Sequence, residues 1–353
     1  MDSRDNYIST AKAIGIILMV IGHSIGPNCF CRFIYFFHMP LFFFCSGFFY
    51  KVPESWYLCG QFVIRRIKGL YFPFVKWSII FLLLHNLFFY LLFYPIDNDY
   101  YGIYDIGDYI GHLRSILITM TGQDKMLDPF WFLKELLFAS IIVCLLTFFL
   151  KKFSFRYKKL LLWLVLIALA VITKPGELGV PVIWNLSILF LSATFFMAGH
   201  IYHKIENKDS YNWAGFFISM AIVFSVTLIW NDSLDMLWYN AYSVLLYIPT
   251  ALVGIFMVLS ASNLLERYRI KYYFYYIGNN TLIILSLHLL VFKIVNYIII
   301  SVYDLPIECL ADTYIKQKNQ LLWIIYVVVG IVLPLLFQKF YGVVVGSKLC
   351  KSN

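Results

Sequence analysis

The chain has 353 residues, of which 61% are hydrophobic, 20% aromatic and only 13% charged. Soluble domains carry about a quarter charged residues, so this composition excludes a soluble globule and indicates a membrane protein. The net charge of +9 would suit a nucleic-acid binder, but the basic residues fall mostly in short connections between apolar segments, as an orientation signal does. The seven cysteines include no CxxC pair or His/Cys cluster at zinc spacing, so we predict neither a metal site nor a disulfide framework.

Ten apolar segments have lengths near those needed to cross about 30 Å of hydrocarbon. They lie near residues 8–26, 33–50, 72–94, 130–150, 160–174, 183–203, 213–230, 241–262, 280–302 and 320–340. We therefore predict an all-α integral membrane protein, a bundle of about ten transmembrane helices. It forms one membrane domain over residues 1–353, with no soluble domain. Lys and Arg favour one set of connections by about three to one, which predicts that both termini are cytoplasmic.

The first apolar segment carries two ionisable residues on one face. Lys12 and His23 are eleven residues apart, which brings their directions to within roughly 20° of each other and separates them by about 16 Å along the axis. A charge inside the bilayer costs at least a few kcal/mol, so such residues are functional candidates. The alternative is that Lys12 snorkels to the inner interface and His23 only caps the helix.

The second apolar segment contains a histidine beside a proline. Pro40 has no backbone N–H, which leaves the Phe36 carbonyl free and predicts a kink next to His38. His38 lies about as deep as His23, so the two imidazoles are placed to converge on one pocket. Alternatively, His38 is a buried histidine satisfied by a neighbouring backbone carbonyl.

A basic stretch and an acidic connection follow. Arg65, Arg66 and Lys68 lie on the predicted cytoplasmic side, where they would either clamp a phosphate-rich ligand or anchor lipid headgroups. The longest outer connection, 95–129, is acidic. It includes an amphipathic stretch over 106–120 that suits a helix on the outer interface.

The fourth apolar segment opens with aromatic residues. Trp131 and Phe132 would form either an interfacial aromatic belt or a platform on which sugar rings stack. Glu135 lies about one turn further in, near the depth of the histidines, where it could orient an imidazole.

The ninth apolar segment carries a polar stripe. Asn280, Ile284 and His288 follow one another at intervals of four residues, so they share one helix face that deepens toward the bilayer middle. Polar contacts between helices explain this stripe as well as a binding site does.

Five motifs follow one another along the chain. They are Lys12 with His23, Phe37-His38-Met39-Pro40-Leu41-Phe42-Phe43-Phe44 with Ser46-Gly47, Tyr71-Phe72-Pro73, Trp131-Phe132-Leu133, and Gly278 with Leu285-Ser286-Leu287-His288. Together they resemble acyltransferase family 3, most closely its branch of fucose 4-O-acetylase-like sugar O-acetyltransferases. The resemblance covers nearly the whole chain. Lys12 departs from the arginine that is commoner in the family, which keeps the charge but loses the planar fork.

The resemblance implies transfer of an acetyl group from acetyl-CoA to a hydroxyl of a sugar, in a surface polysaccharide or its lipid-linked precursor. Acetyl-CoA would be a cosubstrate and not a tightly bound cofactor, and the enzyme would sit among membrane lipids in a bacterial inner membrane. By the same resemblance His23 would act as general base, and His38 or Glu135 would orient it. The remaining site residues would be Lys12, Arg65, Arg66 and Lys68 for the CoA phosphates, and Trp131, Phe132, Asn280, Ser286 and His288 for the acceptor.

Two alternatives stay open from the residues. The acyl group could pass through an acyl-histidine intermediate instead of moving directly. The chain could also be a transporter, such as an exporter of glycan precursors, because transporters place ionisable groups near the bilayer midplane. An inverted repeat with paired broken helices would favour a transporter, and we find none in the sequence.

Overall fold

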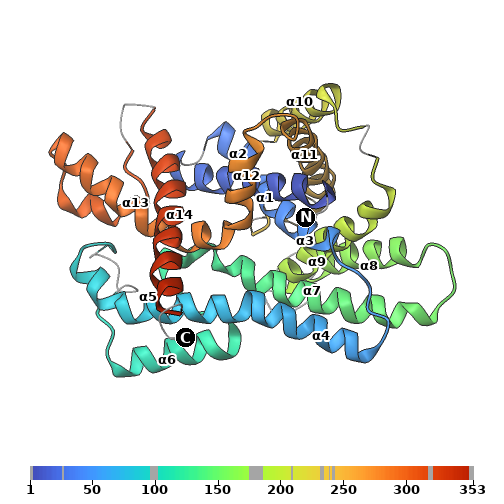
Figure 1. Cartoon of the computed structure of the whole chain (residues 1–353), viewed down its shortest axis with the longest axis horizontal. Helices are drawn as coiled ribbons and strands as arrows, with labels where there is room; N and C mark the ends of the chain where they lie inside the picture. Colours follow the sequence, from blue (N-terminus) through green and yellow to red (C-terminus); the bar gives the residue numbers. More distant parts are fainter. Residues whose placement is uncertain are drawn as a thin grey trace. The chain divides into compact units, whose positions relative to one another are not determined.

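The computed structural model describes residues 3–25, 28–95, 102–174, 186–207, 210–230, 234–237, 239–240, 243–316 and 321–349. Throughout these ranges the only regular elements are helices, so the prediction of an all-α fold is confirmed (Figure 1). Within them, eight helices are long and apolar enough to cross a membrane. They are Asn6–Ser24, Cys29–Phe48, Trp56–Tyr90, Lys125–Lys152, Leu186–Ile205, Val244–Leu265, Thr281–Tyr303 and Leu322–Tyr341.

The two other predicted segments form shorter apolar helices, α8 (Lys158–Ile172) and α10 (Trp213–Ile229). Within the described residues, each of the ten predicted segments thus contains helix, as expected because a backbone in hydrocarbon must satisfy its hydrogen bonds within the helix. The number of helices that cross the bilayer and the side on which the termini lie stay predictions.

The chain divides into two units, which are described separately. The first contains residues 1–15, 27–73 and 132–278. It holds the first half of α1 (Ser3–Ile25) and most of the elements up to Gly278. These are α2 (Cys29–Tyr35), α3 (His38–Phe48), α4 (Trp56–Arg66), α7 (Trp131–Phe149), the 3-10 turn η4 (Leu150–Lys152), α8, α9 (Leu186–Ile205), α10, α11 (Val244–Leu265) and α12 (Lys271–Asn279).

The centre of the first unit is the contact between α3 and α9, which lie side by side. Glycines allow this approach. A Cβ on Gly47 would overlap the carbonyl of Phe196, and a Cβ on Gly199 would overlap the carbonyl of Phe44. Small residues at such positions let two helix backbones touch, which favours packing where lipid offers no hydrophobic drive. Helix α8 packs on the same α9, and α10 packs on α11.

The predicted kink beside His38 is present as a break between α2 and α3. Helix α2 ends at Tyr35, and Phe37, with φ −136° and ψ −17°, precedes α3. Pro40 falls in the first turn of α3, where a missing N–H leaves no intrahelical bond unmade. The second predicted span is therefore two helices joined by two residues.

The second unit contains residues 16–26, 74–131 and 279–353. Its elements are the second half of α1, α5 (Phe72–Tyr90), α6 (Ile106–Thr119), the 3-10 turn η3 (Lys125–Phe130), α13 (Thr281–Tyr303), the 3-10 turn η6 (Ile307–Ala311) and α14 (Leu322–Leu349). Helix α13 lies at its centre, packed against α14, η3 and η6. Helix α6 confirms the amphipathic helix expected over 106–120, and a reciprocal capping box between Asp105 and Asp108 begins it.

Helices α4 and α5 continue into each other through a π-helical turn, η1 (Ile67–Tyr71). The resulting helix runs from Trp56 to Tyr90 over 35 residues, about 50 Å at 1.5 Å per residue. That length exceeds the roughly 30 Å of hydrocarbon that a spanning helix must cross. The basic residues Arg65, Arg66 and Lys68 consequently lie on a helix and not in a loop.

Candidate active site

Two histidines from distant parts of the sequence meet in the second unit. The ring centroids of His23 on α1 and His288 on α13 are 5.4 Å apart, with the ring planes tilted by 47°. At this separation a single substrate group or water molecule can bridge the two imidazoles. The sequence places each histidine in an apolar helix, and the packing of the second unit brings them together.

The backbone around His288 fixes the chemistry of its ring. Its Nδ1 lies 2.9 Å from the carbonyl oxygen of Ile284 and 3.1 Å from that of Leu285. Since carbonyls only accept, Nδ1 carries the proton and donates, which leaves Nε2 as a lone-pair acceptor. The side chain is fully buried and Nε2 has no hydrogen-bond partner. An unpaired buried acceptor costs about 1–3 kcal/mol, so this arrangement is typical of a site that awaits a ligand.

His23 is held less tightly. Its side chain is half-buried, and among the described residues no hydrogen bond to its ring is found. The charged group that acts on it most directly is the carboxylate of Asp128, in η3. The sequence did not identify Asp128 as a site residue, because nothing in it distinguishes Asp128 from the other acids of the 95–129 connection. The feature that could have identified Asp128 is its position two residues before Phe130, at the aromatic start of a predicted spanning helix.

Asn280, which directly precedes α13, and Ser286, on α13, are both already hydrogen-bonded. Asn280 accepts a hydrogen bond of 2.6 Å from Nε2 of Gln338 on α14. The hydroxyl of Ser286 donates to the Leu282 carbonyl at 2.8 Å and is completely buried. These contacts support packing between helices and within α13. The predicted roles of Asn280 and Ser286 toward an acceptor stay predictions.

His38 belongs to the first unit and lies at the helix break. Its Nδ1 lies 3.0 Å from the carbonyl of Ile34, to which it donates, and its ring meets Tyr35 edge-on at 4.9 Å. The side chain is buried. His38 thus satisfies a carbonyl at the end of α2, as the structural alternative expected, and its predicted role in orienting His23 stays a prediction.

Glu135 is also buried in the first unit, where it forms no hydrogen bond or ion pair with any described residue of that unit. Its electrostatic neighbour in the loop before α11 is Tyr239. Burial raises the pKa of Tyr239 to about 12, and the negative charge of Glu135 adds to the rise. The phenol therefore stays protonated at neutral pH, and its hydroxyl is a proton donor close to a buried carboxylate.

The two residues of the predicted aromatic platform lie in different environments. Phe132 is buried among Phe42 and Phe43, with ring centroids 5.6 Å and 5.0 Å away, so its ring helps to form the core of the first unit. Trp131, the last residue of the 74–131 segment of the second unit, is half-buried. Their predicted contact with a sugar stays a prediction.

The predicted phosphate-binding residues also have distinct environments. Arg65 and Lys68 are exposed on one side of the α4–η1 helix. Arg66 turns inward, with its guanidinium 5.0 Å from the ring centroid of Phe62 and 5.5 Å from that of Phe196. Lys12 is half-buried on α1, and its ammonium acts electrostatically on Cys45 of α3. In the first unit the structure therefore separates Arg66 from the solvent-facing Arg65 and Lys68.

Comparisons with known proteins identify one relationship. The model of acyltransferase family 3, described as an acyltransferase domain, matches residues 5–339. No curated protein and no solved structure matches the chain significantly. Because the match runs through every helix described above, from α1 into α14, the chain belongs to acyltransferase family 3, a family of membrane acyltransferases.

Proposed function

We propose that this membrane acyltransferase moves an acetyl group from cytoplasmic acetyl-CoA to a hydroxyl of a sugar, in a surface polysaccharide or a lipid-linked glycan. The observation that carries the proposal is the pairing of His23 and His288 in the second unit, with centroids 5.4 Å apart and one buried nitrogen unpartnered. Transfer to a hydroxyl needs a group that removes its proton, and an imidazole does so near neutral pH.

In the proposed reaction His23 takes the proton of the sugar hydroxyl as the oxygen attacks the thioester carbonyl. The C–S bond then breaks, and the departing thiolate of CoA takes up the proton from His23. The product is the acetyl ester of the sugar and free CoA. His288 keeps its own proton on Nδ1, and its Nε2 accepts a hydrogen bond from His23 or from the acceptor.

In the proposed reaction the carboxylate of Asp128 supplies the negative charge that stabilises protonated His23. When His23 takes a proton it becomes an imidazolium, and a carboxylate that acts on the ring stabilises that cation. His288 can assist only as an acceptor through Nε2, since its Nδ1 proton is already donated to α13 carbonyls. The donor phosphates would be held by the basic residues Lys12, Arg65, Arg66 and Lys68, of which Arg65 and Lys68 are exposed.

Replacement of the proposed base tests this function. We expect His23→Ala to lower the rate of acetyl transfer from labelled acetyl-CoA by about 10²- to 10⁴-fold, the range for loss of a general base. His203→Ala is the matched control, because His203 is an exposed histidine on α9. Both variants should reach the membrane in equal amount, measured by immunoblot. Full transfer by His23→Ala would refute the assignment.

The same preparation separates the two chemical routes. An acyl-histidine intermediate predicts that labelled acetyl groups accumulate on the protein in the absence of acceptor. Direct transfer predicts no labelled protein after rapid quenching. Analysis of the surface glycan by NMR, with and without the gene, would identify the sugar and the position that is acetylated.

A further inference from the structure

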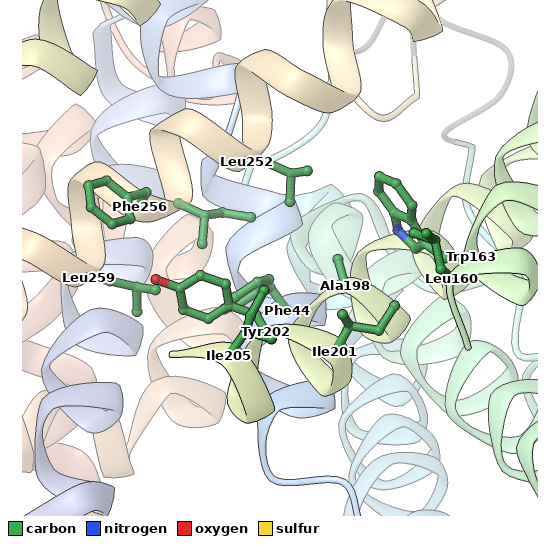
Figure 2. Close-up of a pocket in the computed structure, with 11 residues that line it drawn as sticks. Phe44, Leu160, Trp163, Ala198, Ile201, Tyr202, Ile205, Leu252, Phe256 and Leu259 are labelled. Atoms are coloured by element: carbon green, nitrogen blue, oxygen red, sulfur yellow. The ribbon is translucent and has the colours of Figure 1, made fainter. Parts of the chain in front are cut away.

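A groove with apolar walls lies in the first unit. Helices α8, α9 and α11 line it with aliphatic and aromatic side chains, and Phe44 of α3 also contributes to the lining. Figure 2 shows side chains of α9 facing those of α11, with Trp163 and Leu160 of α8 at one end. Its lining residues are Phe44, Leu160, Trp163, Ala198, Ile201, Tyr202, Ile205, Leu252, Ile255, Phe256 and Leu259.

The groove suits a hydrocarbon chain. Its volume is about 260 Å³, roughly nine times the 30 Å³ that one water molecule occupies in the liquid. The two polar side-chain atoms in the lining are already paired. Trp163 donates to the Thr194 carbonyl at 3.1 Å, and the Tyr202 hydroxyl accepts from Tyr211 at 2.9 Å. An apolar occupant therefore leaves no polar group unsatisfied.

A cluster of cations adjoins one side of this groove. Lys159 and Lys204 come directly before Leu160 and Ile205, so each lysine precedes a lining residue along its helix. The ammonium of Lys159 has Lys204 and Lys158 as charged neighbours. We call these three residues the lysine cluster.

The lysine cluster is positively charged, and among the described residues no anion balances it. Lys159 Nζ donates to Nε2 of His200 at 2.7 Å, and Nδ1 of His200 donates to the Tyr50 carbonyl at 2.9 Å. His200 is therefore a neutral acceptor and adds no negative charge. Across the described ranges no carboxylate pairs with the cluster. Glu206, the nearest acid in sequence, accepts a hydrogen bond from Tyr7 instead.

We propose that this groove binds an anionic phospholipid, with one acyl chain between α8, α9 and α11 and the headgroup phosphate on the lysine cluster. Like charges held together without a counterion repel, and a phosphate converts that repulsion into attraction. Basic pockets between helices on the cytoplasmic side bind acidic headgroups in this way. The connections that carry these lysines are predicted to be cytoplasmic.

Lipid retention by purified protein tests the proposal. Detergent-purified, delipidated protein is mixed with phosphatidylglycerol or phosphatidylcholine, and bound lipid is measured by native mass spectrometry. We expect the double variant Lys159→Ala/Lys204→Ala to lose about thirtyfold in affinity for phosphatidylglycerol, from the usual contribution of each lysine near an acidic headgroup. The matched control is Lys151→Ala/Lys152→Ala, which removes the same charge from exposed residues of η4.

Three further measurements test the role of charge, the role of the lining and the identity of the ligand. Lys159→Arg/Lys204→Arg should retain binding, which shows that the lost affinity reflects charge and not misfolding. Leu160→Trp, at a half-exposed position of the lining, should weaken lipid binding without removing a cation. CoA and inorganic phosphate should not displace the lipid. Equal binding of phosphatidylcholine, equal loss in the Lys151/Lys152 control, or displacement by CoA would each overturn the proposal.

Discussion

At the scale of single residues, the structure gives His288 a property that spacing does not reveal. Its Nε2 is buried and unpaired, whereas both ring nitrogens of His200, another buried histidine, are hydrogen-bonded. We expect His288→Phe to keep or raise the midpoint of thermal unfolding, because it removes an orphan acceptor that costs about 1–3 kcal/mol. The same substitution should strongly lower the rate of acyl transfer.

His200→Phe is the comparison for that variant. It leaves the Tyr50 carbonyl and the Lys159 ammonium without a partner, so the unfolding midpoint should fall. If His288→Phe destabilises the protein as much as His200→Phe does, Nε2 of His288 has a structural partner and the site assignment fails.

The sequence predicted some of the spatial relations among these residues and not others. Lys12 and His23 share a helix, so their common face follows from helical geometry alone. The meeting of His23 with His288 joins segments separated by more than two hundred residues, and Asp128 enters from a 3-10 turn. Such contacts depend on how helices pack, which a hydropathy pattern does not encode.

At the scale of elements, the contact between α3 and α9 depends on two glycines. We expect Gly199→Ala to destabilise the protein by about 1–3 kcal/mol, because its methyl group would overlap backbone atoms of Phe44 and Phe48. Gly60→Ala on α4 is the matched control. No atom lies within 4 Å of its added Cβ, so it should be neutral or stabilise its helix by up to about 1 kcal/mol. Thermal unfolding in detergent compares the two.

Equal midpoints for the two alanine variants would mean that α3 and α9 are not in backbone contact. Local signals did predict several element boundaries. Pro40 indicated the break beside His38, and amphipathicity indicated α6. The continuity of α4 into α5 was not predicted. Arg65, Arg66 and Lys68 were placed in a connection before the apolar segment 72–94, whereas a π-helical turn carries one helix through them.

At the scale of the whole molecule, the charge asymmetry of the connections predicts an orientation that both proposals use. The lysine cluster and the donor-binding residues face the cytoplasm only if the connections around residues 151–159 do. Two exposed positions report on this: Ser154, in that connection, and Gly111, on α6 of the acidic connection. A cysteine at either position is accessible to a thiol reagent from its own side of the membrane.

We expect a membrane-impermeant maleimide to label Gly111→Cys in intact spheroplasts, and to label Ser154→Cys only after the membrane is permeabilised. Cys29 and Cys309, which are partly exposed, are first replaced by serine so that they add no signal. The parent without either new cysteine gives the background. Labelling of Ser154→Cys in intact spheroplasts would show that the topology is the opposite of the predicted one. It would place the lysine cluster against the outer leaflet and Arg65 and Lys68 away from cytoplasmic acetyl-CoA, so the donor side of the proposed reaction would have to be reassigned.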